Sequence, residues 1–276
     1  MNARLTKWPV AAAAGLSLLI PTAPASAQDE EDGEDRRGRI VTIGGGPQLV
    51  PTYPGADSLE IRPMPVFDIR REGEPIQFEA PDEGWGFGLL GRDSAFNIGP
   101  AVQFQGRRRE EDVGAPVGNV GFTVEAGAFT EAYLGDSFRL RAEGRRGFFG
   151  HKGWVGDLEA DFIVRDGDRY IFSIGPRARF ADSDYMAAYF GVTPQAAAAS
   201  GLPAFAPEGG LYAAGGTAGL RFQLGGPWEA HAYGRYDRLM GDAADSPIVT
   251  SFGSRNQFSA GLGISYSFTI GGSRRR

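Results

Sequence analysis

The chain has 276 residues, of which 42% are hydrophobic and 22% charged, with a formal net charge of −6 and no cysteine. The acidic balance and the lack of a clustered basic face argue against a nucleic-acid partner. Without cysteine, an exported protein of this size is held together by something other than disulfides.

Residues 1–27 have the three parts of a secretory signal peptide. Arg4 and Lys7 form a basic start, residues 9–20 are mostly apolar, and Ala25-Ser26-Ala27 has the A-x-A form of a cleavage site. We expect this segment to be removed on export. Residues 28–39 carry six acids, three arginines and no apolar side chain, which predicts an acidic flexible periplasmic tail.

From residue 40 the sequence consists mainly of stretches of about ten residues in which apolar and polar side chains alternate. The clearest is QFSAGLGISYSF, residues 257–268, in which every even-numbered position is apolar or aromatic. A period of two is typical of a strand with one apolar and one polar face. Residues 154–165 repeat the pattern with full charges on the polar face.

The charged faces decide between two all-β architectures. A soluble sandwich would bury the apolar faces in a core, whereas a membrane barrel would turn them to lipid and keep the charges in its lumen. For an exported, cysteine-free chain we favour the barrel. We therefore predict an antiparallel up-and-down transmembrane β-barrel over residues 40–270, in the outer membrane of a Gram-negative cell, followed by a basic C-terminal tail at residues 271–276.

Short and long links between the strands alternate, as the turns and loops of such barrels do. The exception is Pro75–Leu90, unless residues 81–84 (Pro-Asp-Glu-Gly) form an external turn between two short strands. We predict twelve strands, which includes that turn, with ten strands as the fallback without it. The longest link, residues 182–209, contains Thr193 as an N-cap, Pro194 at the first helical position and Gly201 as a stop, which predicts a short helix of about two turns.

Three neighbouring strands carry basic, acidic and basic side chains on their lumen faces. These are Arg139, Arg141 and Arg145, then Asp157, Glu159 and Asp161, then Arg177 and Arg179. We expect Asp157 or Glu159 to pair with Arg177 or Arg179, and Arg139 or Arg141 to pair with Glu159 or Asp161. The alternative is a path for charged solutes.

No residue is predicted to be catalytic, to bind a cofactor or to ligate a metal. Residues 86–91 match G-x-G-x-x-G, but an alternating strand follows where the dinucleotide motif needs a helix. Ser137 lies in a turn with no base beside it, because His151 belongs to the opposite rim and His231 to a lumen face. Two histidines without a zinc motif do not indicate a zinc site.

Several segments closely resemble the signature of the MltA-interacting protein (MipA/OmpV) family of outer-membrane proteins. The most specific are YFGVTPQAAAASGLPAF at residues 189–205 and RLMGDAADSPIV at residues 238–249. Shorter matches are TYPG at residues 52–55, RPMP at 62–65, GHKG at 150–153 and GSRNQF at 253–258. One departure is the tail after Phe268, since such barrels usually end on an aromatic residue.

The resemblance implies a non-enzymatic outer-membrane barrel that acts as a scaffold for murein-synthesising and murein-hydrolysing enzymes. Its implied partners are a lytic transglycosylase and a penicillin-binding protein, in addition to outer-membrane lipid and lipopolysaccharide. No cofactor and no catalytic residue carry over from the family. Two other functions stay open from the sequence: a small-solute, porin-like channel, and a lipid-modifying enzyme of the outer membrane.

Overall fold

The structure is a computed structural model, and it describes residues 38–91 and 94–271. The predicted signal peptide, most of the acidic tail and nearly all of the basic C-terminal tail lie outside the described residues. Those three assignments therefore stay predictions.

The described chain forms one antiparallel sheet with the strand order β2-β1-β11-β10-β9-β8-β7-β6-β5-β4-β3. The first strands in the chain are β1 (Arg39–Pro51), β2 (Leu59–Arg71), β3 (Trp85–Gly86), β4 (Phe96–Gln105), β5 (Thr123–Leu134) and β6 (Phe138–Phe149). They are followed by β7 (Trp154–Asp166), β8 (Tyr170–Ala181), β9 (Gly210–Gly225), β10 (Trp228–Leu239) and β11 (Asn256–Ile270). Each strand from β4 onwards pairs with the next one along the chain, and β1 pairs with β11, so that Ile40 lies opposite Thr269.

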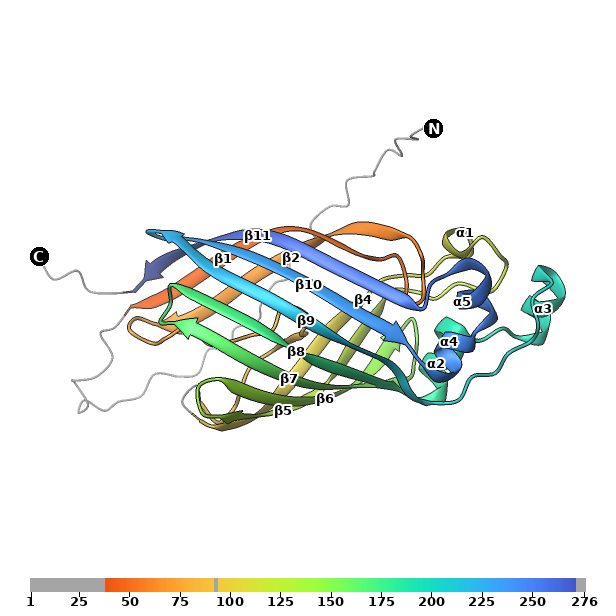
Figure 1. The fold of residues 1–276 in the computed structure, drawn as a ribbon, viewed down its shortest axis with the longest axis horizontal. Helices are drawn as coiled ribbons and strands as arrows, with labels where there is room; N and C mark the ends of the chain where they lie inside the picture. The colour runs from red at the N-terminus through yellow and green to blue at the C-terminus, as the bar shows by residue number, and fades with distance from the viewer. Residues whose placement is uncertain (1–37, 92–93, 272–276) are drawn as a thin grey trace, which may run out of the picture. The chain divides into compact units, whose positions relative to one another are not determined.

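The sheet curls around a shared interior (Figure 1). We call the curled sheet the barrel and its interior the lumen. Side chains meet on this inner side: the Tyr233 hydroxyl of β10 donates over the intervening β11 to Gln48 Oε1 of β1 at 2.5 Å. The edge strands are β2 and β3, and no ladder between them exists in the described part of the chain. The edges approach each other near the start of β2, where the Arg62 guanidinium lies directly against Gly106.

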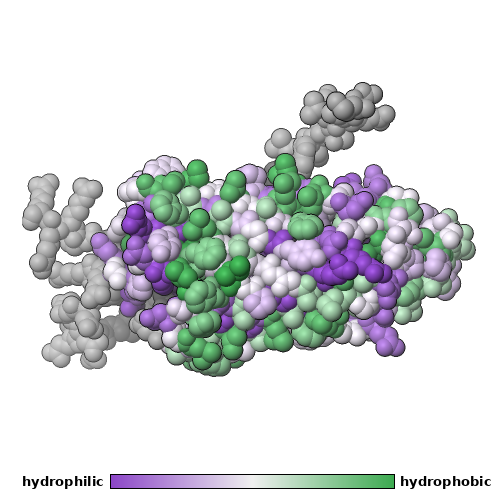
Figure 2. Space-filling model, viewed as in Figure 1, coloured by the Kyte–Doolittle hydropathy of each residue, from purple (hydrophilic) through white to green (hydrophobic). Residues whose placement is uncertain are grey.

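The predicted alternation is confirmed strand by strand. Apolar side chains of alternate residues are exposed on the outer face, for example Leu262 at 65% and Ile61 at 67%. The charged residues between them are buried, for example Asp161 at 2% and Arg177 at 3%. Figure 2 shows the outer face, where hydrophobic residues form a band over the strands and hydrophilic residues gather toward the two ends.

The helices of the described residues lie in the long links and gather at one end of the barrel, which we call the loop end (Figure 1). They are α1 (Glu110–Val113), α2 (Ser183–Phe190), α3 (Pro194–Ser200), α4 (Gly241–Asp245) and α5 (Pro247–Phe252). The predicted short helix is α3: the Thr193 side chain accepts from Ala196 N, and Gly201 ends it with a φ of 76°. Helix α2 was not predicted. No described helix has the length and apolar character needed to cross a membrane.

The prediction of twelve strands is wrong for the described residues, which contain eleven, one of them only two residues long. The difference lies in residues 75–84. They do not form a strand, and their Pro-Asp-Glu-Gly turn is not external but lies inside the lumen, where its acids pair with wall arginines. The segment lacks the alternation that a strand through the wall requires, and its carboxylates are stabilised by guanidinium partners inside.

Candidate functional site

The lumen wall contains the basic, acidic and basic stripes that the alternation predicts, and they pair as expected. Arg139 Nη2 donates to Asp161 Oδ2 at 2.7 Å, and Arg177 Nη2 donates to Asp161 Oδ1 at 2.8 Å. Arg179 Nη1 donates to Asp157 Oδ1 at 2.9 Å. Asp161 thus bridges two arginines on its two neighbouring strands, with all three side chains almost fully buried.

Residues 75–84, which we call the inserted segment, run through this lumen. The apolar side chains Ile76, Phe78 and Ala80 form a small core with Ile163 of β7 and Ile171 of β8. Backbone contacts hold its start, since Ile76 N donates to Asp168 Oδ1 at 3.1 Å and Arg165 Nη2 donates to Ile76 O at 2.8 Å. The segment is therefore packed against the wall and belongs to the folded structure of the lumen.

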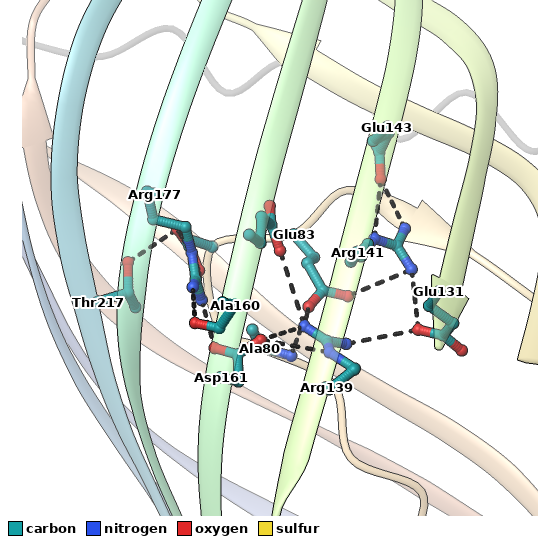
Figure 3. A network of polar contacts seen from close by, with 12 residues as sticks. Ala80, Glu83, Glu131, Arg139, Arg141, Glu143, Ala160, Asp161, Arg177 and Thr217 are labelled. Atoms are coloured by element: carbon teal, nitrogen blue, oxygen red, sulfur yellow. Dashed lines mark hydrogen bonds and ion pairs between the residues drawn. The ribbon is translucent and has the colours of Figure 1, made fainter. Parts of the chain in front are cut away.

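The turn of the inserted segment places two carboxylates against polar side chains of β6, β8 and β9. Asp82 accepts from Arg177 Nε at 3.1 Å, from Arg179 Nη2 at 3.2 Å and from Thr217 Oγ1 at 2.8 Å. Glu83 accepts from Arg139 Nη2 and from Ala80 N. Figure 3 shows Glu83 beside Arg139 and Arg141, with Glu131, Asp161, Arg177 and Thr217 on the neighbouring strands of the wall.

The loop end of the barrel is covered by α2, α4 and α5, which we call the helical cap. Its buried core includes Tyr189, Phe190 and Ala243, each 0% exposed, together with Tyr185 and Met186. Below it the imidazole of His151 packs edge-on against the Tyr185 ring at 4.9 Å between centroids. Desolvation by burial raises the pKa of Tyr185 well above its ordinary value. The helical cap thus has a buried apolar core of its own.

The opposite end, where the links are short turns, has a recess of about 570 Å³. It is lined by polar and apolar residues of several strands and turns, among them Arg70, Ile76, Asp168, Arg169 and Glu229. We call it the turn-end recess. It is the opening of the lumen beneath the inserted segment, and it presents both signs of charge.

The structure gives no support to a nucleophilic site at Ser137. Ser137 and His151 lie at opposite ends of β6, a separation of roughly 36 Å for an extended strand of this length. A different serine–histidine contact does occur, Ser265 Oγ to His231 Nε2 at 2.8 Å. There Glu229 accepts from the serine hydroxyl and lies nearest the same imidazole nitrogen, so it does not orient the imidazole as the acid of a triad does.

Several residues of the network could not be assigned from alternation alone. Asp82 and Glu83 lie in a link, and Thr217, Glu131 and Asp237 carry no signal beyond their inward parity. The sequence feature that indicates the inserted segment is the interruption of strand periodicity between Pro75 and Leu90. The arginines were predicted to pair with the wall, and the structure shows that they also bind the inserted segment.

An antiparallel barrel with an apolar exterior and a charged, packed interior has the arrangement of a transmembrane β-barrel protein. The chain matches the family described as "MltA-interacting protein MipA" over residues 43–268. It therefore belongs to the MipA family, as the sequence motifs indicate. None of the curated proteins matches the chain.

Solved structures with a similar outline include several bacterial outer-membrane proteins. An outer membrane channel from Pseudomonas putida is 10% identical, with a TM-score of 0.39, and the match covers 87% of this chain and 100% of that one. The outer membrane channel DcaP of Acinetobacter baumannii is 8% identical, with a TM-score of 0.35 and coverage of 84% and 96%. A FadL homologue of Pseudomonas aeruginosa is 9% identical, with a TM-score of 0.34 and coverage of 85% and 90%.

Proposed function

We propose that this protein is a non-conducting β-barrel of the Gram-negative outer membrane that acts as a scaffold for murein-synthesising and murein-hydrolysing enzymes. The observation that carries the non-conducting part is the inserted segment, whose Asp82 and Glu83 pair with arginines on β8 and β6. The helical cap, with its buried Tyr189 and Phe190, supports the same conclusion at the loop end. A solute path would need both elements to move.

The membrane location is supported by the outer face. Its exposed aliphatic and aromatic side chains, such as Ile61, Leu140 and Leu262, would be costly in water and favourable against lipid. The lumen charges are enclosed by the wall, which is the reverse of a soluble protein. We also propose that the signal peptide is cleaved on export and that the outer face of the barrel contacts outer-membrane lipid.

The scaffold role is supported by the family, whose description contains an interaction with MltA. We propose a lytic transglycosylase as the first partner and a penicillin-binding protein as the second. Both work on the periplasmic side, and we place the turn end there. The turn-end recess, with Asp168 and Arg169 at its rim, is the surface that we assign to the partner.

Two measurements test the proposal. In planar bilayers the refolded mature protein should show no stable single-channel conductance, and steady ion-conducting steps would favour the small-solute channel. In a pull-down with the purified transglycosylase, Arg169→Glu at the recess should reduce capture about tenfold or more, since rim charges at an interface steer and orient the partner. Lys152→Glu, an exposed loop-end change, is the matched control and should leave capture unchanged.

A lipid-modifying activity is the third alternative, and a mutation separates it from the scaffold. If the Ser265–His231 contact were catalytic, Ser265→Ala would abolish hydrolysis of phospholipid by the refolded protein. We expect no hydrolysis to abolish. The Ser265 side chain is 1% exposed and lies inside the wall, away from any lipid ester.

A further inference from the structure

The outer face of the barrel contains a hollow of about 480 Å³, which we call the outer groove. Small residues lie at its centre, and larger apolar or aromatic side chains surround them. The small residues are Gly216, Ala218, Gly234 and Ala260, and the larger ones are Leu49, Leu59, Ile174, Tyr236 and Phe258. In the sheet, Gly234 lies directly between Ala218 of β9 and Ala260 of β11. The volume falls in the range of about 300–1,000 Å³ that is usual for ligand sites.

The fold does not require a small residue at the centre of the outer groove. A Cβ atom added at Gly234 would meet no atom within 4 Å beyond its chain neighbours, and the backbone there is not left-handed. A leucine would extend the apolar outer face, as Leu220 and Leu262 do on the two neighbouring strands. The glycine therefore keeps a space open on the outer face. Because its lining is apolar, this space suits a hydrocarbon chain.

A positive charge lies beside the outer groove. Arg238 follows Tyr236 by two residues on β10, so it also faces outward, and it lies nearer the loop end. Its Nη1 donates to Asn256 Oδ1 at 3.1 Å, and the Tyr236 hydroxyl donates to the same oxygen at 2.9 Å. In the part of the chain that the structure describes, no carboxylate oxygen lies within 4.0 Å of the Arg238 guanidinium. An exposed guanidinium with only a neutral partner is free to bind a phosphate.

We propose that the outer groove binds lipid A, the phosphorylated lipid anchor of lipopolysaccharide, with an acyl chain in the groove and a phosphate on Arg238. The inference rests on the proposed function, which places the turn end in the periplasm and therefore the loop end at the outer leaflet. Lipid A belongs to that leaflet and carries its phosphates on the sugars that hold its acyl chains. Basic side chains at a membrane surface recognise such head groups, and aromatic rings such as that of Tyr236 are typical of the interface.

The test uses mature protein refolded in detergent without lipopolysaccharide, to which purified lipid A is added before native mass spectrometry. We expect about one lipid A to stay bound per chain. Lipid A from which the phosphates have been removed should bind about tenfold more weakly, because Arg238 then lacks a charged partner. Phosphatidylglycerol should also bind more weakly. Inorganic phosphate should not displace lipid A, since it leaves the groove empty.

Two variants change the two parts of the site separately. Arg238→Gln removes the charge and Gly234→Leu fills the groove, and each should weaken lipid A binding about tenfold or more. The matched controls are Arg146→Gln and Gly144→Leu on the outer face of β6. Arg146 is exposed beside the Trp154 ring, and a Cβ added at Gly144 would also have open space. Neither control residue lines the outer groove, so both variants should bind lipid A as the wild type does.

The proposal is overturned if the wild type binds no lipid A, or if either Arg238→Gln or Gly234→Leu binds it as tightly as the wild type. Equal losses in the β6 controls would indicate lipid contact over the whole wall and would also overturn it. So would equal affinity for phosphatidylglycerol, or displacement by inorganic phosphate.

Insertion of the wild type into lipid vesicles separates this proposal from the proposed function. A barrel that inserts but retains no lipid A contradicts only the lipid A site. A chain that does not insert contradicts the membrane location and, with it, the site.

Discussion

At the scale of single residues, the lumen depends on carboxylates that each serve more than one arginine. Asp161 accepts from Arg139 on one neighbouring strand and from Arg177 on the other. Because all three groups are removed from water, the loss of one leaves the others with too few opposite charges, which costs more than the pair itself contributes.

We therefore expect Asp161→Asn to lower the free energy of unfolding by about 3–5 kcal/mol, because Arg139 and Arg177 stay buried and lose their shared anion. Asp136→Asn, in an exposed turn, should change it by no more than about 0.5 kcal/mol. Urea titrations of the refolded proteins, followed by tryptophan fluorescence, measure both. A loss below about 1 kcal/mol for Asp161→Asn would mean that the lumen is filled with water.

Residue pairing is also the part of the site that the sequence predicted best. Alternation alone placed Asp157 and Arg179 on facing strands, and the structure confirms their contact. Asp82 could not be assigned in this way. Its partner Arg177 lies 95 positions further along the chain, and no local pattern records a contact between a link and a distant strand.

At the scale of elements, the inserted segment lies inside the lumen and the helical cap covers its loop end. The sequence predicted neither, for different reasons. Residues 75–84 have no periodicity, so an external turn and an internal one look the same. The α2 sequence, from Ser183 to Phe190, lies in a long link and becomes a helix whose buried side chains pack against other loop-end elements.

Replacing residues 76–83 with a glycine–serine linker of equal length should remove the obstruction and leave the strands in place. We expect ion-conducting steps in planar bilayers where the wild type shows none, together with a lower unfolding temperature, because Arg139, Arg177 and Arg179 lose Asp82 and Glu83. The matched change replaces residues 194–201 in the exposed α3 loop and should give no conductance. If the first replacement gives no conductance, the helical cap alone is sufficient to close the barrel.

The cap has its own dependence on pH. Burial raises the pKa of Tyr185 above its ordinary value, so the folded state favours the neutral phenol. The resulting stability is fully present below about pH 10 and is lost as the pH rises further, by about 1.4 kcal/mol per pH unit for one tyrosine.

Tyr185→Phe should weaken this alkaline loss, because a phenyl ring has no proton to release. Tyrosinate absorbance and limited proteolysis of the loop end, both measured between about pH 9 and 12, should show later ionisation and later cleavage in the variant. Tyr170→Phe, at the turn end, is the comparison and should leave the cleavage profile unchanged.

At the scale of the whole molecule, the apolar outer face determines where a charged side chain lowers stability. Leu262 is central in β11 and Leu224 is near the end of β9, and both face outward with 65% and 56% exposure. Leu262→Arg should cost about 2–4 kcal/mol and Leu224→Arg about 0–1 kcal/mol, because the penalty falls toward the membrane interfaces. Refolding equilibria in lipid vesicles measure the difference. Equal costs would contradict a bilayer around the barrel.

The all-β class and the orientation of the strands were predictable from the sequence because both follow from a local period of two. The number of strands was not predictable, since it depends on whether residues 75–84 pass through the wall or stay inside it. The ion pairs of Asp82 and Glu83 with arginines far along the chain hold these residues inside. The fold could therefore be inferred from the wall residues, whereas the position of residues 75–84 inside the lumen could be seen only in the structure.

The ladder between β1 and β11 has a consequence for how the protein is made. Ile40 pairs with Thr269, which lies 229 positions further along the chain. Contacts at such long sequence separation form slowly. Until β11 arrives, β1 and β10 each expose an open edge to other chains. The wall therefore forms last at this ladder, and the unpaired edges favour association between chains until it does.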